Sequence, residues 1–449
     1  MVDPGRLVDR ASELEKLDKA WEKGGLVVVY GRRRIGKTRL ILEWARGKRH
    51  AYYQAGLWGH RANIEGLSQA IEEQLGVPGA SGVGDLKSLL SLTAGFVRER
   101  AAVVIDEFTY WARTDPGVVS DIQWFVDHVL PGSKLLLVLT GSLLGVIERS
   151  VLGGGAPLYG RAGLRLRIEE LSPWCIPSFA PGYTPSQLVE TYSLFGGTPY
   201  YLRLLDPSKT PLDAWHELLG PQGLLGDEPI FALRDEFRDP HPYLALLQAM
   251  AAAPWTLVGK AAARAGLPSS HASIYARRLV ALGVLREVPL LSPGRRRLYS
   301  IVDKPLRALL SYPAHALEGD SPRVRQWYAR IVAQGWEELA MYHATYHLAR
   351  VLGVNASRAG KVLHRGGEVD WVVIDEENER ILAVEAKWTS MSRVDAERLA
   401  GRLRNLVPSL LPARYGHYPV TPVLYLRGAG GGGGYHLVTP GDLPWGECR

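Results

Sequence analysis

The sequence is poor in cysteine and asparagine. Its 449 residues include two cysteines, Cys175 and Cys448, which define no disulfide framework and lack the spacing of a zinc site. We expect Cys175 to be a small, half-buried residue. Few amides beside abundant arginine, glutamate and proline are typical of a heat-adapted source. The asparagines are Asn63, Asn355, Asn378 and Asn405.

Long apolar runs are also absent. No window approaches the roughly 18 uninterrupted apolar residues of a membrane-spanning helix, and residues 1–17 lack the apolar core of a signal peptide. We therefore expect a cytoplasmic protein with no membrane partner. The formal net charge is +7. A basic balance favours polyanionic partners, but over this length the excess is modest, so the positions of the arginines are more informative.

Short apolar runs alternate with amphipathic stretches over the first third of the chain. Most of the runs are aliphatic and nearly continuous, as expected for strands of a parallel sheet covered on both faces. Segments 38–46 and 63–75 between them have helical spacing. This alternation predicts a doubly wound α/β domain. The predicted strands are 26–30, 50–54, 101–107 and 134–142.

The stretch after the first predicted strand has the frame G-x-x-x-x-G-K-T of a phosphate-binding loop. An apolar strand precedes it and a helix follows, which is the context that supports the motif. Glycines let backbone N–H groups point at phosphate oxygens, and the helix adds its positive end. Lys37 reaches the β and γ phosphates, and the Thr38 hydroxyl ligates Mg²⁺. We expect ATP or ADP with Mg²⁺ to contact Gly31, Arg32, Arg33, Arg34, Ile35, Gly36, Lys37, Thr38 and Arg39.

Two acids end the predicted strand 101–107. At that position they lie beside the phosphate loop, so Asp106 would hold the hydrated Mg²⁺ and Glu107 would polarise the attacking water. The alternative is a helix cap or a surface acid pair. The strand 134–142 ends in Thr140 and Ser142, and in this class of ATPase a polar residue there touches the γ-phosphate or the water.

These features resemble a known family, the archaeal P-loop ATPases related to AAA+ and STAND NTPases, which carry a winged helix and an appended C-terminal domain. The resemblance covers nearly the whole chain, with the motifs in family order. They are LVDRASELEKL (7–17), YGRRRIGKT (30–38), VVIDEF (103–108), LTGS (139–142), LYGR (158–161), FGGTPYYL (195–202), DEPIFALRDEFRDP (227–240) and YSIVDKPLR (299–307).

The resemblance implies four parts: a P-loop ATPase domain over 1–165, a helical lid over 166–240, a winged helix over 241–315 and a nuclease-like domain over 316–449. It also implies roles for single residues. Arg10 and Glu13 would flank the adenine, Arg161 would sense the γ-phosphate, and Pro199 would pack on the nucleotide from the lid. Alternatively, Arg161 forms a surface ion pair and Pro199 ends a tight turn. A homo-oligomer is possible, so Arg161 could act in its own chain or across an interface.

Residues 241–301 read as helix, helix, turn, helix and a basic hairpin around Ser292-Pro293-Gly294, the order of a winged helix. Arg277 and Arg278 lie on the candidate recognition helix, and residues 295–297 are three arginines. A helix for the major groove and a basic wing for phosphates suit DNA. In STAND-like ATPases, however, such a module often serves as a lid. The predicted apolar face of the helix comprises Ile274, Leu279, Leu282 and Leu285.

The segment 364–388 predicts a second site. If 376–379 form the turn of an antiparallel hairpin, opposed residue numbers sum to 755. Asp370 then faces Glu385, and Glu368 faces Lys387, on one face of two adjacent strands. The opposite face would contribute a core of Val369, Trp371, Val373, Val384 and Ala386.

Two acids and a lysine arranged in this way resemble the PD-(D/E)XK nucleases, although Val369 replaces the proline. Asp370 and Glu385 would hold Mg²⁺, and Lys387 would position hydroxide or stabilise phosphate charge. Glu337, with Glu338 as second choice, would supply the upstream helical acid. The alternative is cross-strand ion pairing, but facing acids repel unless a cation intervenes.

The sequence therefore predicts an ATP-hydrolysing protein that binds DNA and has a metal-dependent nuclease-like site. The rival hypothesis is an ATP-driven regulatory switch whose C-terminal domain is an inactive nuclease fold used for interaction. In either case the side chains of Arg32, Arg33 and Arg34 should mostly project outward, where they could meet the winged-helix lid, a neighbouring subunit or DNA.

Overall fold

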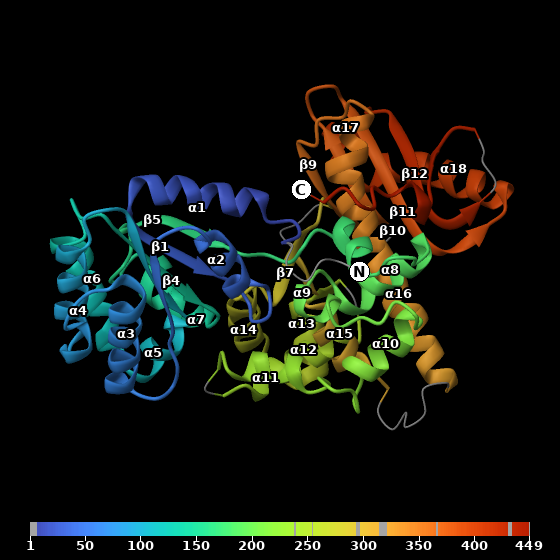
Figure 1. Cartoon of the computed structure of the whole chain (residues 1–449). Helices are drawn as coiled ribbons and strands as arrows, with labels where there is room; N and C mark the ends of the chain where they lie inside the picture. The colour runs from blue at the N-terminus through green and yellow to red at the C-terminus, as the bar shows by residue number, and fades with distance from the viewer. Residues whose placement is uncertain are drawn as a thin grey trace. The chain divides into compact units, whose positions relative to one another are not determined.

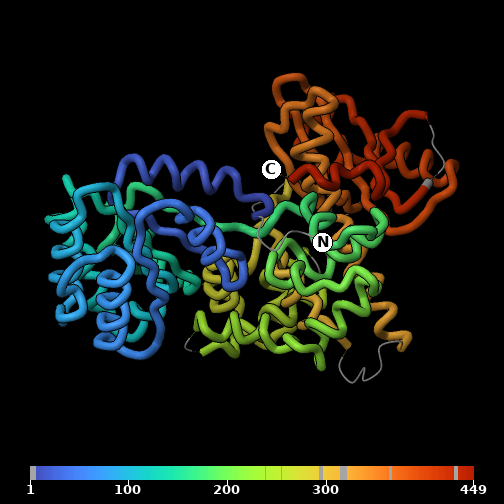
Figure 2. The backbone as a smooth tube through the Cα atoms, in the orientation of Figure 1, coloured from blue at the N-terminus to red at the C-terminus, as the bar shows by residue number. Residues whose placement is uncertain are grey.

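The computed structural model describes residues 7–237, 239–253, 255–292, 297–313, 321–364, 367–429 and 433–448. They form two compact units. One unit, called the ATPase unit after the domain predicted there, comprises residues 7–171, Thr198–Tyr200 and Cys448. The second unit comprises Ser172–Gly197 and Tyr201–Glu447. Figures 1 and 2 trace the chain through both units. Among the described residues, no helix combines the length and the apolar character needed to cross a membrane.

A five-stranded parallel sheet forms the centre of the ATPase unit, in the order β2-β3-β4-β1-β5. The four predicted strands are confirmed. The fifth was missed because its leucines alternate with arginines, as on a half-exposed edge, so it has no continuous apolar run. The strands are β1 Gly25–Tyr30, β2 His50–Gln54, β3 Ala101–Asp106, β4 Leu135–Gly141 and β5 Ala162–Arg167.

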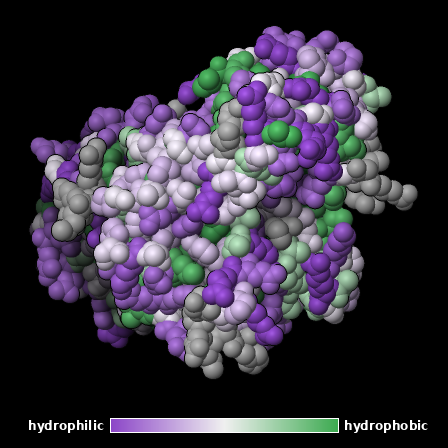
Figure 3. All heavy atoms as spheres, turned by 90° about the vertical axis from the view of Figure 1, so that its right-hand side faces the viewer, coloured by the Kyte–Doolittle hydropathy of each residue, from purple (hydrophilic) through white to green (hydrophobic). Residues whose placement is uncertain are grey.

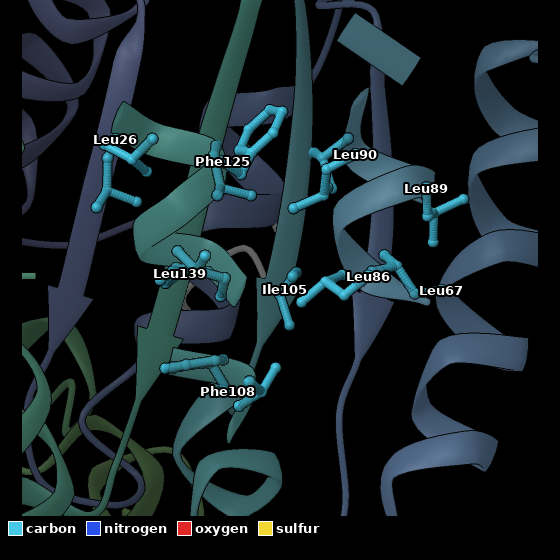
Figure 4. Packing of buried hydrophobic residues seen from close by; sticks show 14 of the residues in the cluster. Leu26, Leu67, Leu86, Leu89, Leu90, Ile105, Phe108, Phe125 and Leu139 are labelled. Atoms are coloured by element: carbon cyan, nitrogen blue, oxygen red, sulfur yellow. The ribbon is translucent and has the colours of Figure 1, made fainter. Parts of the chain in front are cut away.

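Helices cover both faces of this sheet. Alternate residues of each strand face two separate cores: Leu26 and Val28 of β1 pack in one, and Val27 and Val29 pack in the other. Figure 4 shows the first core, where Ile105 and Leu139 from the strands meet helical side chains such as Phe125. The helices are α1 Ala11–Lys23, α2 Lys37–Ala45, α3 His60–Leu75, α4 Leu86–Phe96, α5 Phe108–Thr114, α6 Gly117–His128 and α7 Leu144–Ile147.

The second unit begins with helices joined by proline-containing segments. Several of these helices start with a threonine cap followed by proline, as Thr184 and Pro185 do at α8, since proline fits the first helical turn. The helices up to residue 251 are α8 Pro185–Phe195, α9 Pro199–Leu202, which spans the boundary between the units, α10 Pro211–Leu218, α11 Glu228–Arg234 and α12 His241–Ala251.

A three-stranded antiparallel sheet, ordered β6-β8-β7, accompanies α12, α13 and α14. The bounds are β6 Thr256–Leu257, α13 Val258–Ala265, α14 Ser269–Ala281, β7 Leu285–Pro289 and β8 Arg297–Ile301. Ile274 is 52% exposed, so its predicted place on the apolar face is wrong. The buried stripe runs through Ala272, Ala276 and Leu279, and Ile274 lies about 140° from Leu279 around the helix. The hairpin tip with Arg295 and Arg296 lies outside the described residues.

The C-terminal part is a five-stranded mixed sheet, ordered β13-β12-β11-β10-β9, between α16 and α18. The remaining elements are α15 Lys304–Ser311, α16 Pro322–His343, α17 Ala349–Val351, β9 Arg358–His364, β10 Gly367–Asp375, β11 Arg380–Met391, α18 Arg393–Leu410, β12 Val420–Ala429 and β13 His436–Val438. On the face shown in Figure 3, hydrophilic side chains predominate and hydrophobic ones form small groups.

The register of the predicted hairpin is confirmed. Trp371 pairs with Val384 and Asp375 with Arg380, so opposed numbers sum to 755. One core residue was assigned to the wrong face. Val369 packs in the α18 core, whereas Trp371 packs in the α16 core, because a register shift between Val369 and Val372 interrupts the alternation.

The cysteines differ from expectation. Cys175 is fully buried rather than half-buried. Neither Cys175 nor Cys448 is free, since both are disulfide-bonded. A sequence with two distant cysteines gives no spacing from which such a bond can be predicted.

Candidate functional site

The phosphate-binding loop connects β1 to α2 at the carboxyl edge of the sheet. A Cβ on Gly31 would lie 2.5 Å from the carbonyl oxygen of Ile168, so only glycine fits there. Gly36 caps α2 at φ 93°, in the region that favours glycine. The loop therefore turns directly into a helix whose N–H groups are available to an anion.

Lys37 is buried at the first position of α2. Its ammonium donates to the carbonyl oxygens of Gly31, at 3.0 Å, and Arg32, at 3.1 Å. The same nitrogen lies 3.9 Å from Glu107 Oε1. Two loop carbonyls and one acid thus hold the ammonium at the loop itself, where phosphate oxygens would enter.

Asp106, at the end of β3, is fully buried, and its carboxylate accepts hydrogen bonds from three hydroxyl groups. Thr38 Oγ1 donates to Oδ2 at 2.7 Å, Tyr52 OH donates to the same oxygen at 2.6 Å, and Thr140 Oγ1 donates to Oδ1. Burial, and then the bond to Asp106, raise the pKa of Tyr52, so the phenol stays protonated. The adjacent hydroxyl and carboxylate of Thr38 and Asp106 are oxygen donors of the kind Mg²⁺ prefers.

Thr140, predicted to contact the nucleotide, is hydrogen-bonded to both acids. Its hydroxyl is fully buried behind Asp106 and also accepts from the Glu107 backbone N–H at 3.0 Å. Thr140 thus connects the Asp106 carboxylate to the backbone of Glu107. Tyr52 was missed by the sequence analysis, although its position two residues before the end of β2, beside β3, could have indicated it.

Glu107 follows β3 with φ 52° and caps α5. Positive φ is uncommon for a residue with a side chain, and such residues concentrate at functional sites. Oε2 accepts from Ser142 N at 3.2 Å and from Ser142 Oγ at 2.6 Å. Ser142, at the end of β4, thus orients one carboxylate oxygen of Glu107, while the other faces Lys37.

The three loop arginines do not all project outward. Arg32 forms an ion pair with Glu170, and the guanidinium of Arg34 lies 4.2 Å from the ring centre of Tyr200. Arg33 alone of the three is exposed, with its guanidinium 5.7 Å from the ring centre of Tyr110. Arg33 therefore projects outward as expected, whereas Arg32 and Arg34 do not. Arg39 is half-buried on α2.

Arg10 and Pro199 both lie against the loop. Arg10 is buried and donates to the carbonyl oxygens of Ile35, at 3.4 Å, and Glu169, at 2.8 Å. Burial lowers the pKa of its guanidinium. Pro199 Cγ lies 3.6 Å from where a Cβ on Gly36 would stand. Both residues are thus in position to support the loop, and Glu13 lies 3.4 Å from Arg10.

Arg161 lies at the other end of the sheet. It precedes β5, whose first residue pairs with Leu26 near the start of β1, whereas the phosphate loop follows the end of β1. Its guanidinium forms a two-point ion pair with Asp127, at 2.7 and 2.9 Å. The expectation that Arg161 senses the γ-phosphate in its own chain is therefore wrong, because about five residues of strand, roughly 16 Å, separate them.

The predicted acids and lysine of the C-terminal domain do lie together. Asp370 Oδ2 accepts from the Ala386 N–H at 2.8 Å, and Lys387 lies 2.9 Å from Glu385. The alternative of an ion pair between Glu368 and Lys387 is not found in the described part of the chain, since Lys387 pairs with Glu385. Glu368 lies 3.7 Å from Lys361, a fully buried lysine of β9 that the sequence analysis missed.

Lys361 also pairs with Glu337 of α16, which brings the predicted helical acid to this cluster. Burial, and then Asp370, raise the pKa of Glu337 to about 7 despite Lys361. Burial and Asp370 likewise raise the pKa of Glu385. Within the described ranges, however, Glu337, Asp370 and Glu385 do not bring one oxygen each within 4.8 Å of one another.

Glu338, the second choice for the helical acid, belongs to a different network. It is fully buried, lies 2.6 Å from Lys304 and pairs with Arg307. Burial alone would raise the pKa of Glu338, but these cations lower it to about 2. This acid stabilises the packing of α15 on α16 and is not available to a metal.

The arginines of α14 differ in environment. Arg278 donates to the Tyr243 hydroxyl at 3.3 Å and lies over Phe237, 5.3 Å from its ring centre. Arg277 is exposed. Both arginines are exposed, and Arg278 differs in its aromatic contacts.

Comparison with known proteins agrees with the loop geometry. Residues 7–205 match the family described as an ATPase domain predominantly from Archaea, and residues 315–399 match a family of archaeal and bacterial proteins of unknown function. An uncharacterised protein of Methanocaldococcus jannaschii is 26% identical over 408 residues, covering 87% of this chain and 90% of the relative. An uncharacterised ATP-binding protein of the same organism is 46% identical over 44 residues, 9% of this chain and 75% of that protein.

A solved structure supports the fold. The Walker-type ATPase of Pyrococcus abyssi aligns with 69% of this chain and 97% of its own, with a TM-score of 0.55 and 17% identity, so the likeness concerns the fold alone. The family match, the parallel sheet and the phosphate loop all indicate the same class of protein. They support an ATP-binding P-loop protein whose residues 7–205 are similar to the archaeal ATPase domain.

Proposed function

We propose that the protein hydrolyses ATP at the carboxyl edge of the parallel sheet and uses turnover to handle DNA. The observation that carries the first part is the convergence of Lys37, Thr38, Asp106 and Glu107 on the loop between β1 and α2. Thr38 and Asp106 would hold Mg²⁺, which would neutralise charge on the phosphates.

Each protein group has a separate task. The N–H groups at the start of α2 and the Lys37 ammonium bind phosphate oxygens. Glu107 accepts a proton from the attacking water, and Ser142 holds its carboxylate in one orientation. Because Glu107 stands in the left-handed region at the start of α5, its direction is determined by the backbone as well as by Ser142.

Substituting Lys37 and Glu107 should separate binding from hydrolysis. Lys37→Ala should lose nucleotide affinity. Glu107→Gln should bind ATP normally and reduce kcat by about 10²–10⁴-fold, since the general base is removed. The measurements are titration with a fluorescent ATP analogue and release of inorganic phosphate.

The matched control for these variants is Glu169→Gln, an acid on the same edge whose side chain pairs with Arg167. It should turn over as the wild type does. Normal turnover by Glu107→Gln would show that another group is the base.

For the DNA part, the order of α12, β6, α13, α14, β7 and β8 supports a winged helix with α14 as the recognition helix. Arg277 and Arg278 are both exposed on this helix, and Arg277 is the one without an aromatic contact to Phe237 and Tyr243. The net charge of +7 is compatible with a polyanion. We infer that duplex DNA contacts Arg277.

The C-terminal cluster is the candidate for DNA cleavage. Glu337 and Glu385 have raised pKa values because of burial and because Asp370 repels them. A divalent cation would relieve this repulsion, and the carboxylates are suitable donors for Mg²⁺ or Mn²⁺. The buried ammonium of Lys361 already offsets part of the charge, which favours the rival hypothesis of an inactive nuclease fold in a regulatory switch.

Cleavage of plasmid and branched DNA with Mg²⁺ or Mn²⁺ tests this site. The nuclease hypothesis predicts cleavage by wild type and loss of at least about tenfold in rate for Lys387→Ala, since Lys387 stabilises charge at the reacting phosphate. Arg398→Ala, which removes an exposed cation of α18, is the control. No cleavage of any substrate, together with unchanged DNA affinity in Arg277→Glu, would support the switch instead.

A further inference from the structure

One surface of the ATPase unit is not used by the nucleotide site. The loop 55–59 follows β2 and presents Leu57, 50% exposed, and Trp58, 68% exposed. It lies on the edge that carries the nucleotide residues, because the Ala55 N–H donates to the Asp106 carbonyl oxygen at 2.8 Å. Two large apolar side chains on one exposed loop beside a catalytic edge indicate a contact with another molecule.

The loop is held rigidly by a buried asparagine. Asn63, one of the four in the sequence, is fully buried on α3. Its Oδ1 accepts from Gly56 N and from the Tyr53 hydroxyl, both at 3.0 Å. Its Nδ2 donates to the carbonyl oxygens of Gly56, at 3.0 Å, and Gly59, at 2.8 Å. Both polar atoms of the Asn63 amide thus hold this loop in place.

One side of the Trp58 indole ring lies against the backbone of its own loop. It lies against Gly56, where a Cβ would come 2.2 Å from the ring, so any other residue at 56 would displace it. An aromatic ring fixed against the backbone and otherwise largely exposed is preorganised for stacking, since it loses little conformational freedom when a flat group binds.

Two arginines flank a second ring at the same edge. The guanidinium groups of Arg33 and Arg113 lie 5.7 and 5.6 Å from the ring centre of Tyr110, and both arginines are exposed. Arg33 comes from the phosphate loop and Arg113 from α5. α5 is joined to the start of α3 beside the Trp58 loop, because Trp111 Nε1 donates to His60 Nδ1 at 3.2 Å.

We propose that this surface, formed by Leu57, Trp58, Arg33, Tyr110 and Arg113, binds single-stranded DNA. A base stacks on Trp58, and the two guanidinium groups contact the backbone phosphates. Single-stranded nucleic acid is favoured over a duplex because stacking requires an unpaired base, and over a polypeptide because exposed guanidinium pairs around an aromatic ring suit phosphate. This inference rests on the proposed role in DNA handling.

The position of Arg33 connects the two ligands. Its backbone belongs to the loop that holds the nucleotide phosphates, and its side chain belongs to the DNA surface. Single-stranded DNA should therefore stimulate ATP turnover, and its affinity should differ between the ATP and ADP states.

The test measures binding of a labelled oligothymidylate of about 20 nucleotides, longer than the ~4–16 nucleotides of common binding sites, to the full chain at several salt concentrations. Trp58→Ala should weaken binding about tenfold or more without changing the salt dependence, and Trp58→Phe should retain most of the affinity. Arg113→Gln should reduce the slope of log affinity against log salt by about 0.7, because one phosphate contact is lost.

Trp124→Ala is the matched control. Trp124 is 40% exposed on α6 of the same unit, and its ring stacks on His128 at 5.1 Å. Binding by Trp58→Ala equal to wild type, or an equal loss in Trp124→Ala, would overturn the proposal. Stimulation of turnover by an unfolded polypeptide and not by the oligonucleotide would also overturn it.

Binding of duplex DNA distinguishes failure of the single-stranded DNA site from failure of the proposed role in DNA handling. If wild type binds duplex DNA through Arg277 but Trp58→Ala binds the oligothymidylate normally, only the inference fails. If wild type binds neither DNA, the proposed DNA role fails and this inference fails with it.

Discussion

At the scale of single residues, the nucleotide site depends on contacts between side chains from distant strands. Asp106 and Glu107 are adjacent in sequence but have different surroundings. Asp106 is enclosed by three hydroxyl donors, whereas Glu107 is held by Ser142 and faces Lys37. Neighbouring acids thus have different surroundings, as the proposed roles in metal binding and proton transfer require, because the backbone turns at the positive φ of Glu107.

Ser142 offers a direct test of this division. Its hydroxyl donates to Glu107 at 2.6 Å, and a hydrogen bond to a charged group contributes about 1.5–3 kcal/mol. Ser142→Ala should lower kcat for ATP roughly tenfold and leave nucleotide affinity unchanged, while Ser142→Thr keeps the hydroxyl and should remain active. Steady-state phosphate release and nucleotide titration measure both quantities. A loss of affinity without a change in kcat would assign Ser142 to binding.

At the scale of elements, α16 directs adjacent acids into two different networks. Glu337 reaches the cluster with Lys361, and Glu338 reaches Lys304 and Arg307. Their pKa values accordingly move in opposite directions, to about 7 and about 2. One helix can do this because successive residues are about 100° apart around its axis.

The two acids should have opposite effects on stability against pH. Glu338, with a lowered pKa, stabilises the fold above its ordinary pKa of 4.5, and this stability is lost as pH falls toward 2. Glu337, with a raised pKa, favours folding below 4.5, and this contribution is lost as pH rises through 7.

Urea unfolding of matched variants measures this difference. Glu338→Gln should destabilise the second unit by roughly 3–5 kcal/mol at neutral pH, because two buried cations lose their counter-charge. Glu337→Gln should cost much less and should flatten the loss of stability between pH 4.5 and 7. Equal unfolding midpoints for wild type and Glu338→Gln would show that the buried network contributes nothing.

At the scale of the whole molecule, the chain builds two units with separate cores, and the ATPase unit includes a short segment from far along the sequence. Thr198–Tyr200 belong to it, whereas the residues on both sides belong to the second unit. Pro199 lies against Gly36, and Tyr200 lies under Arg34. The polypeptide itself therefore links the phosphate loop to the unit that carries α14 and the C-terminal cluster.

Local sequence was sufficient for features whose physical causes are local. Three buried strands, β1, β3 and β4, were visible as aliphatic runs, the phosphate loop as spaced glycines before a helix, and the hairpin register as a turn with fixed pairing numbers. Alternation along a strand is also local, but it failed at Val369 because a register shift depends on the neighbouring strand.

Tertiary structure decided what depends on distance across the fold. It placed Arg161 at the end of the sheet away from the phosphate loop of its own chain, and Thr140 within hydrogen-bonding distance of Asp106. It brought Tyr52 to Asp106 and buried Lys361 beside Glu337. The sequence around a charged or polar residue does not show which residue it will pair with. Ion pairs and hydrogen bonds act over a few ångströms, between strands and helices that are far apart in sequence.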